Sequence, residues 1–306
     1  MRFTKLFAAS CILVISSGAL CEESAVEQDR LRFKSLKKHA SVGTHEFEGH
    51  RFLDVFSSPA KRLSESEIAE ISKTTSVRWY AIKYSMDSPF YIPPPVGFDA
   101  RYMKALGGNL ELGYLSIPRA RITSKDTSVI RNFTKLRTLD IRYTDIDGEI
   151  FRQISSSHFD SLLLSGTDAS HELSKLPSKI QVESILASGA KLDADDLLQL
   201  SRVLKLKRLY LSNVIPVHDG LDRMEFFGLA YLDLSQNKPT DSPKLNELVR
   251  HFLDSSDLLK KIDLRGIVID ESIALRLFKR SPGLTYLVDR RLLDSDVAKL
   301  LAATDE

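Results

Sequence analysis

The chain has almost no cysteine. Its 306 residues include two, Cys11 and Cys21, and both lie close to the N-terminus. The rest of the chain can therefore hold neither an internal disulfide nor a cysteine zinc site, and thiol catalysis is excluded with them. A chain of this length can bury a core without such cross-links.

Motifs that carry chemistry are also missing. The sequence contains no glycine-rich phosphate loop, no G-x-S-x-G and no H-E-x-x-H. The histidines are scattered, with His158, His171 and His251 at spacings that do not suit a shared metal ion. We therefore expect a protein that is not an enzyme, with no catalytic residue, no metal site and no cofactor.

Excess charge and long hydrophobic runs are lacking as well. The formal net charge is +2, and both of these charges are accounted for by Arg2 and Lys5 near the N-terminus. A nearly neutral protein gives no reason to expect binding to nucleic acid. The apolar run at residues 6–15 is too short to span a bilayer, and no later stretch is long and apolar enough for a transmembrane segment.

The N-terminus has the layout of a secretory signal peptide. Arg2 and Lys5 precede the apolar run, and small residues follow it at 16–19. Cleavage after Ala19 and cleavage after Cys21 both fit. We expect a protein that is secreted or that lies in the periplasm or cell envelope.

Cys21 also raises the question of a lipid anchor. A lipoprotein would carry its lipid on this residue. Lipidation sites prefer a small residue directly before the cysteine, and Leu20 departs from that preference. The signal-peptide interpretation is therefore favoured over the anchored one.

A repeated frame fills most of the chain. Residues 136–146 read L-x-x-L-x-I-x-x-T-x-I, and the first, fourth and sixth positions are apolar again about every 24 residues. The fourth-position residues of its copies are Tyr80, Leu115, Leu139, Leu162, Ile185, Leu209, Leu232, Ile262 and Leu287. Each copy predicts a short strand.

The twelfth position of the frame predicts a helix after each strand. It carries residues that cap helix N-termini in all but one copy. These residues are Ser88, Thr123, Asp147, Ser170, Asp193, Thr240, Asp270 and Ser295. Strand and helix cannot bury their apolar faces alone, so the units are expected to stack into a solenoid of α/β class with a parallel sheet on one side and short helices on the other.

The frame divides the chain into segments. Residues 1–21 are expected to be the signal peptide and 22–63 an N-terminal extension, in which 51–56 favours a short capping strand. The repeat solenoid is expected at 64–290, with a proline-rich insertion at about 87–109 that contains a short helix from Asp99 to Leu106. The remaining segment, 291–306, is expected to form a closing helix.

The units resemble leucine-rich repeats of a short bacterial type that is common in secreted planctomycete proteins. Thr144-Asp145-Ile146-Asp147 carries the resemblance best, and it extends over about residues 77–290. The resemblance implies the solenoid fold and a protein as partner. It also implies a Thr or Asn at the ninth position that bonds within the turn, so less regular turns are expected at Val214 and Ile267, where that residue is absent.

The in-and-out alternation of a strand predicts a surface. First-, fourth- and sixth-position side chains point into the core, whereas third-, fifth- and seventh-position side chains point to the concave face. Leu163, Leu186 and Tyr210 should then form an exposed apolar centre with charges around it, as in protein interfaces. The candidate binding residues are Asp140, Arg142, Leu163, Leu186, Arg208, Tyr210, Tyr231, Asp233, Lys261 and Asp263.

Three functional hypotheses follow. The first is a non-enzymatic protein-binding module that uses the concave sheet outside the cytoplasm. The second is a structural or lipid-anchored protein of the cell envelope. The third is an enzyme with its chemistry in the N-terminal segment, where no nucleophile is paired with a base. A cover over the concave residues, such as a loop or the N-terminal segment, is the competing explanation of the apolar centre.

Overall fold

The chain forms one eleven-stranded sheet whose strands lie side by side in sequence order. The computed structural model describes residues 40–47, 50–57, 67, 77–82, 99–108, 110, 112–214, 225–226, 228–280, 283–293 and 297–298. The strands are β1 (Ala40–Phe47), β2 (His50–Ser57), β3 (Val77–Ile82), β4 (Tyr114–Ser116), β5 (Thr138–Asp140), β6 (His158–Leu163), β7 (Gln181–Leu186), β8 (Arg208–Tyr210), β9 (Tyr231–Asp233), β10 (Lys261–Asp263) and β11 (Thr285–Leu287). Apart from the antiparallel pair β1–β2, all neighbouring strands are parallel.

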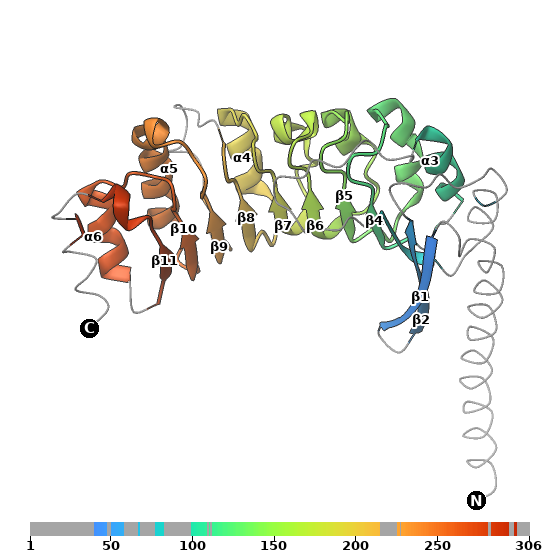
Figure 1. Cartoon of the computed structure of the whole chain (residues 1–306), viewed down its shortest axis with the longest axis horizontal. Coiled ribbons are helices and arrows are strands. Elements are labelled where there is room, and N and C mark those ends of the chain that lie inside the picture. Colours follow the sequence, from blue (N-terminus) through green and yellow to red (C-terminus); the bar gives the residue numbers. More distant parts are fainter. Residues whose placement is uncertain are drawn as a thin grey trace, which may run out of the picture.

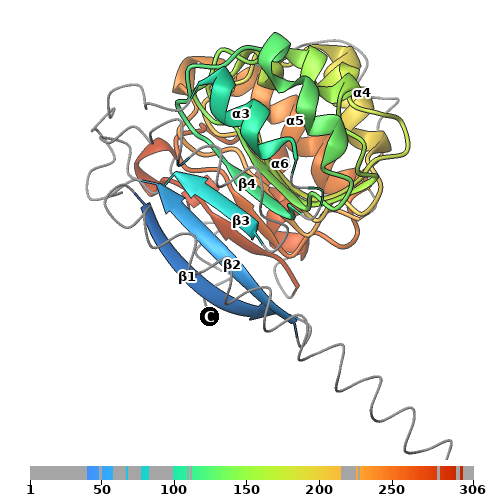
Figure 2. The same cartoon turned by 90° about the vertical axis from the view of Figure 1, so that its right-hand side faces the viewer.

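Short helices connect the strands on one face of the sheet. They are α3 (Ala100–Leu106), α4 (Ala194–Arg202), α5 (Ser242–Ser255) and α6 (Glu271–Arg280), with 3₁₀ segments η2 (Ser124–Asn132), η3 (Gly148–Arg152), η4 (Asp168–His171), η5 (Leu173–Lys175), η7 (Pro239–Asp241) and η8 (Arg290–Leu292). The strands follow the inner edge of an arc and the helices its outer edge (Figure 1). Viewed along the arc, sheet and helices form two separate layers (Figure 2).

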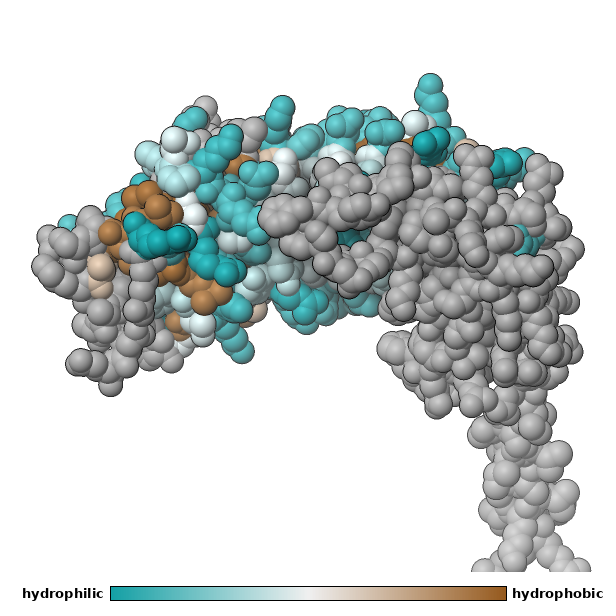
Figure 3. Space-filling model, viewed as in Figure 1, coloured by the Kyte–Doolittle hydropathy of each residue, from teal (hydrophilic) through white to brown (hydrophobic). Residues whose placement is uncertain are grey.

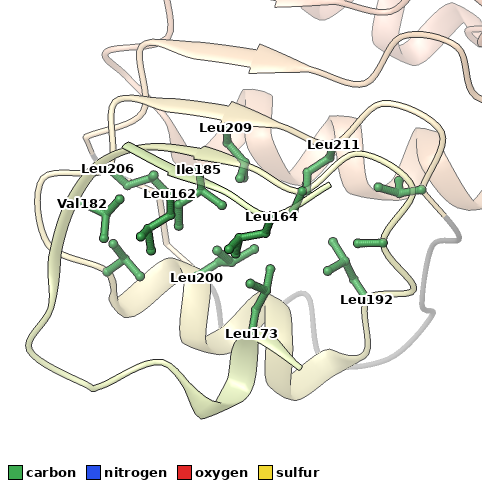
Figure 4. Packing of buried hydrophobic residues seen from close by; sticks show 14 of the residues in the cluster. Leu162, Leu164, Leu173, Val182, Ile185, Leu192, Leu200, Leu206, Leu209 and Leu211 are labelled. Atoms are coloured by element: carbon green, nitrogen blue, oxygen red, sulfur yellow. The ribbon is translucent and has the colours of Figure 1, made fainter. Parts of the chain in front are cut away.

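The predicted frame fits the strand register from β3 to β10. Fourth-position residues are paired across neighbouring strands, as Leu115 is with Leu139 and Ile185 with Leu209. Fourth- and sixth-position side chains such as Leu162 and Leu164 are 0% exposed. They pack between the sheet and the helical layer together with residues from the helices, including Leu173 and Leu200 (Figure 4). The predicted α/β repeat solenoid is thereby confirmed.

The last strand departs from the frame by one residue. Ile262 pairs with Tyr286 rather than with Leu287, and Leu264 N–H donates to the carbonyl oxygen of Leu287. Tyr286 and Val288 therefore take core positions, and both pack against the core as half-buried side chains. The prediction that Leu287 is the fourth-position residue is wrong, because Leu284 and Leu287 imitate the apolar spacing of the frame.

The N-terminal extension contributes more strand than expected. Residues 51–56 were predicted as a short strand, and β2 is longer than that prediction. It also pairs with β1, which the sequence pattern did not indicate. The predicted signal peptide, most of the insertion and most of the closing helix lie outside the described residues.

Helix starts were predicted correctly at several twelfth positions. Asp147 accepts a hydrogen bond from Glu149 N–H, and Asp193 forms a reciprocal capping box with Asp196. Thr123 and Asp270 also stand directly before helical segments. Ser170 and Thr240 are exceptions because each lies inside a 3₁₀ segment; the cap of η4 is Thr167.

One backbone conformation recurs at the eighth position of the frame, three residues beyond the end of each strand from β4 to β10. The residue there has a positive φ in seven successive repeats, namely Arg119, Tyr143, Gly166, Gly189, Asn213, Gln236 and Gly266. Its N–H continues the pairing of the sheet, as Tyr143 donates to Ser165 O at 3.0 Å. The chain thus turns away from the sheet in the same way after each strand from β4 to β10.

The ninth-position hydrogen bond is present but dispensable. Thr144 Oγ1 donates to Ile141 O at 2.7 Å, and Asn237 Nδ2 makes the equivalent bond to Leu234 O at 2.5 Å. The side chain of Ile267 cannot form this hydrogen bond. Its backbone N–H nevertheless donates to Leu264 O at 3.1 Å, and Gly266 before it also has a positive φ. The expected irregularity at Ile267 is therefore wrong, because the backbone makes the turn without help from the side chain.

Leu139→Asp is expected to unfold the repeats around β5. Leu139 is 0% exposed, so the change buries an unpaired carboxylate and should reduce the free energy of unfolding by several kcal/mol. Thr134→Asp places the same charge on an exposed site of the same repeat and should leave stability within about 0.5 kcal/mol. Thermal melting compares the two, and equal melting temperatures would show that the frame is misplaced.

Two glycines separate backbone strain from crowding. Gly189 (φ 81°) has open space around it, whereas a Cβ on Gly266 (φ 91°) would lie 2.9 Å from Asn237 O. Gly189→Ala should cost about 1 kcal/mol for the left-handed backbone alone, and Gly266→Ala about 2–3 kcal/mol. Gly283→Ala, without either feature, should leave denaturant unfolding almost unchanged. Equal losses at Gly189 and Gly266 would contradict the contribution from Asn237.

Candidate functional site

The inner face of the sheet carries the predicted surface. We name the third-, fifth- and seventh-position side chains of β4–β10 the concave strip. Its third positions are Tyr114, Thr138, Ser161, Ser184, Arg208, Tyr231 and Lys261; its fifth positions are Ser116, Asp140, Leu163, Leu186, Tyr210, Asp233 and Asp263; its seventh positions are Pro118, Arg142, Ser165, Ser188, Ser212, Ser235 and Arg265. All ten predicted binding residues belong to this strip.

An apolar row occupies the centre of the concave strip. Leu163 pairs with Leu186, and Leu186 with Tyr210, so the three are neighbours on successive strands as predicted. They were expected to be exposed, and each is half-buried instead. The reason is the strand spacing of about 4.8 Å, which lets neighbouring large side chains cover each other's flanks.

Small residues border this row on both sides. Ser161 and Ser184 stand at the third positions beside it. At the seventh positions, Ser212 Oγ donates to Ser188 Oγ at 2.8 Å, and Ser188 N–H donates to Ser165 Oγ at 3.0 Å. The apolar row therefore stands above its short neighbours and is the part of the central strip that a partner meets first.

Aspartates and arginines two residues apart form closed pairs at both ends of the strip. Arg142 donates to both oxygens of Asp140 at 2.8 Å, and Ser116 Oγ donates to the same carboxylate at 2.9 Å. Arg265 holds Asp263 in the same way, at 2.6 Å for the closest contact. Both carboxylates are 2% exposed, so the arginine covers the aspartate.

These pairs alter the predicted role of the acidic residues. Asp140 raises the pKa of Arg142, mainly through their hydrogen bonds, and Asp263 raises that of Arg265 in the same way. The guanidinium groups stay charged and face outward. A partner on the strip would meet Arg142 and Arg265 rather than the carboxylates beneath them.

Aromatic and basic side chains gather where the apolar row ends. The rings of Tyr210 and Tyr231 lie 5.0 Å apart between centroids, and Lys261 Nζ lies 5.5 Å from the centroid of Tyr231. Burial, helped by Asp233 and Asp263, raises the pKa of Tyr231 to about 12. The phenol therefore remains a hydrogen-bond donor at any physiological pH.

Sequence reasoning missed two contributors to the strip. Arg265 was assigned to the concave face but not to the binding residues, and Ser116 was not recognised as a third partner of Asp140. The role of Arg265 could have been predicted, because Asp140-x-Arg142 recurs as Asp263-x-Arg265 and residues two apart on a strand share a face. The frame places Ser116 beside Asp140, since both stand at the fifth position of successive strands, but it does not show that their side chains form a hydrogen bond.

Comparisons with known proteins add the following. No family model matches the chain, and no curated protein matches it in sequence. Among solved structures, an internalin from Listeria monocytogenes is similar with a TM-score of 0.46 and 18% identity, over 81% of this chain and 64% of that one. The mouse RP105/MD-1 complex is similar with a TM-score of 0.42 and 13% identity, over 79% of this chain and 53% of that one. The chain thus spans less than two thirds of either structure.

The register of the sheet decides the fold. L-x-x-L-x-L strands pair in parallel at equivalent positions, and each ends in the same left-handed turn. The chain has the leucine-rich repeat fold. No helix of this leucine-rich repeat solenoid, within the part that is described, is long and apolar enough to cross a membrane.

A second apolar area of the leucine-rich repeat solenoid lies away from the strip. Hydrophobic residues gather near its C-terminal end, around α6 and the last strands (Figure 3). On α6, Leu275 and Phe278 are 40% and 38% exposed and stand on one side of the helix. The sequence pattern did not predict their exposure, because apolar residues occupy more than one side of α6 and only Ile273, Ala274 and Leu277 among them are buried.

Arg142→Ser should destabilise the leucine-rich repeats, because Asp140 would keep a buried charge without its counterion. Since Arg142 itself is 27% exposed, a loss of about 2 kcal/mol is expected, below the range for a fully buried pair. Adding Asp140→Asn removes the charge but preserves an acceptor for Ser116, so the double variant should recover part of the loss. Denaturant unfolding measures both, and a double variant as unstable as the single one would contradict the electrostatic origin.

Proposed function

We propose that this protein is a non-enzymatic protein-binding module that acts outside the cytoplasm and uses the concave strip as its interaction surface. The observation that carries the proposal is the row Leu163–Leu186–Tyr210, three large side chains that stand in line on a rigid sheet. Polar residues surround the row on every side within the strip. An apolar centre inside a polar rim is the usual anatomy of a protein interface.

The rigidity of the sheet supports this function. Each strand residue of the row lies next to a fully buried neighbour, with Leu162, Ile185 and Leu209 all 0% exposed. The row is therefore held in place before any partner arrives. A preorganised surface loses little conformational entropy on binding, so more of the contact energy appears as affinity.

The proposed location rests on the N-terminal sequence. Basic residues, a short apolar run and small residues follow one another at 1–21, as in a signal peptide. Mass spectrometry of the mature N-terminus tests this. A terminus at residue 20 or 22 supports export, a lipid-modified Cys21 supports the anchored alternative, and an intact Met1 contradicts both.

Leu186→Ala together with Tyr210→Ala is the variant that tests the surface. Anchors at the centre of an interface carry most of its energy, so partner affinity should fall by about 2 kcal/mol or more. Because both side chains are only half-buried, the loss in stability should be smaller than that of Leu209→Ala, which truncates a core side chain and should cost about 2–5 kcal/mol. Thermal melts and binding to a partner captured from the native host give the two readouts.

The two variants are controls for each other. Leu209→Ala should bind normally at temperatures where it is folded, since its side chain points away from the strip. If it loses binding while the double variant does not, the assignment of the two faces is reversed. If neither variant affects binding, the concave strip is not the interaction surface.

A further inference from the structure

Three third-position residues stand in a row at one end of the apolar centre. Arg208 pairs with Tyr231, and Tyr231 pairs with Lys261, across β8, β9 and β10. Their strands are spaced by about 4.8 Å, so the two cations are about 10 Å apart at the backbone. Side chains as long as those of Arg and Lys can converge over the tyrosine between them.

The two cations of this row lack the counterions that other cations of the protein have. Arg142 and Arg265 are closed onto aspartates of their own strands, and Lys207 contacts Glu183 at 2.9 Å. Within the described residues, Arg208 and Lys261 are exposed and form no ion pair or side-chain hydrogen bond. Their positive charge is therefore available to a partner.

Tyr231 adds a neutral donor between the two cations. Its ring is half-buried against Tyr210, which fixes its direction, and Lys261 lies over it at 5.5 Å. Ammonium, phenol and guanidinium groups together offer several hydrogen-bond donors to one side of the strip. Such a donor set suits an anionic oxygen ligand.

The negative charges nearby do not cancel this character. Asp263 lies beneath Arg265 and is neutralised by it. Asp233 is half-buried and accepts a hydrogen bond from Ser235 N–H at 2.8 Å, which directs one of its oxygens along its own strand. Glu183 also lies close enough to Arg208 to interact with it electrostatically, but it is paired with Lys207 at 2.9 Å. Two cations without an ion pair against the carboxylate of Asp233 leave the area with net positive charge.

We propose that Arg208, Tyr231 and Lys261 bind a carboxylate side chain of an extended partner segment whose apolar residues lie on the row Leu163–Leu186–Tyr210. The partner class is thus an acidic–apolar peptide segment. This proposal rests on the proposed function and specifies the ligand of that surface. Because the cations are exposed, they act mainly on the association rate and on its dependence on salt.

A displayed library of random decapeptides tests the specificity directly. The full chain is immobilised, bound peptides are sequenced, and one enriched peptide is synthesised in two forms, with its carboxylates intact and with each Asp or Glu replaced by Asn or Gln. Enriched peptides should combine apolar residues with Asp or Glu. The carboxylate form should bind about fivefold to tenfold more tightly than the amide form, a preference that should shrink as salt is raised.

Charge-removing variants locate the recognition. Arg208→Gln with Lys261→Gln should abolish the preference for the carboxylate form while the amide form binds as it does to the wild type. Lys125→Gln with Lys279→Gln removes the same charge from exposed sites of the helical layer and should change neither. Arg208→Lys with Lys261→Arg should keep the preference, and Tyr231→Phe should reduce it by removing the phenol donor.

The outcomes separate this inference from the function on which it rests. Peptides that need Leu186 and Tyr210 but show no acidic preference, or a preference that survives in the double glutamine variant, overturn the inference and support the binding surface. Enrichment that is independent of Leu186 and Tyr210, or none at all, overturns both. Retention of single-stranded DNA or of phosphatidylserine vesicles by Arg208 and Lys261, without acidic peptides in the library, also overturns the inference.

Discussion

The structure depends on the burial that each repeat can obtain only from its neighbours. A three-residue strand such as Arg208–Tyr210 and a short helix cannot enclose a core alone. Leu209 is fully buried because the repeats on both sides cover it together with the helical layer. The same need recurs in every unit, so the chain repeats one solution and the sheet grows in sequence order.

That stacking also explains why the strand ends tolerate strained residues. Arg119 and Tyr143 are bulky, yet they adopt the left-handed conformation that glycine takes at 166, 189 and 266. Their N–H groups are held by the next repeat, at 2.8 Å from Arg142 O and 3.0 Å from Ser165 O. The pairing energy of the sheet offsets the backbone strain, so the turn persists with several side chains.

The core could be predicted from the sequence because the apolar residues recur with the period of the repeat. The register of β4–β10 follows from the apolar fourth and sixth positions, and the row Leu163–Leu186–Tyr210 follows from that register. The repeat pattern could not predict β1, because β1 lies outside the repeats and pairs antiparallel with β2. It also could not predict the one-residue shift at β11, because Leu284 and Leu287 have the apolar spacing of the frame. The burial of Asp140 and Asp263 could not be predicted from the sequence either, because it depends on the side-chain conformation of the arginine that covers each of them.

Residues two apart on a strand share one face, and this spacing pairs some charged side chains of the strip and leaves others without a counterion. An aspartate at the fifth position and an arginine at the seventh lie on one face of one strand, so they neutralise each other whatever the neighbouring strands contain. Arg208 and Lys261 stand at the third position of their strands. The residue two positions after Arg208 is Tyr210, which has no charge, and the residue two positions after Lys261 is Asp263, which is already paired with Arg265. The electrostatic character of the concave strip is thus set within single strands. It becomes positive where a strand supplies a cation and no free carboxylate beside it, at the end of the apolar row.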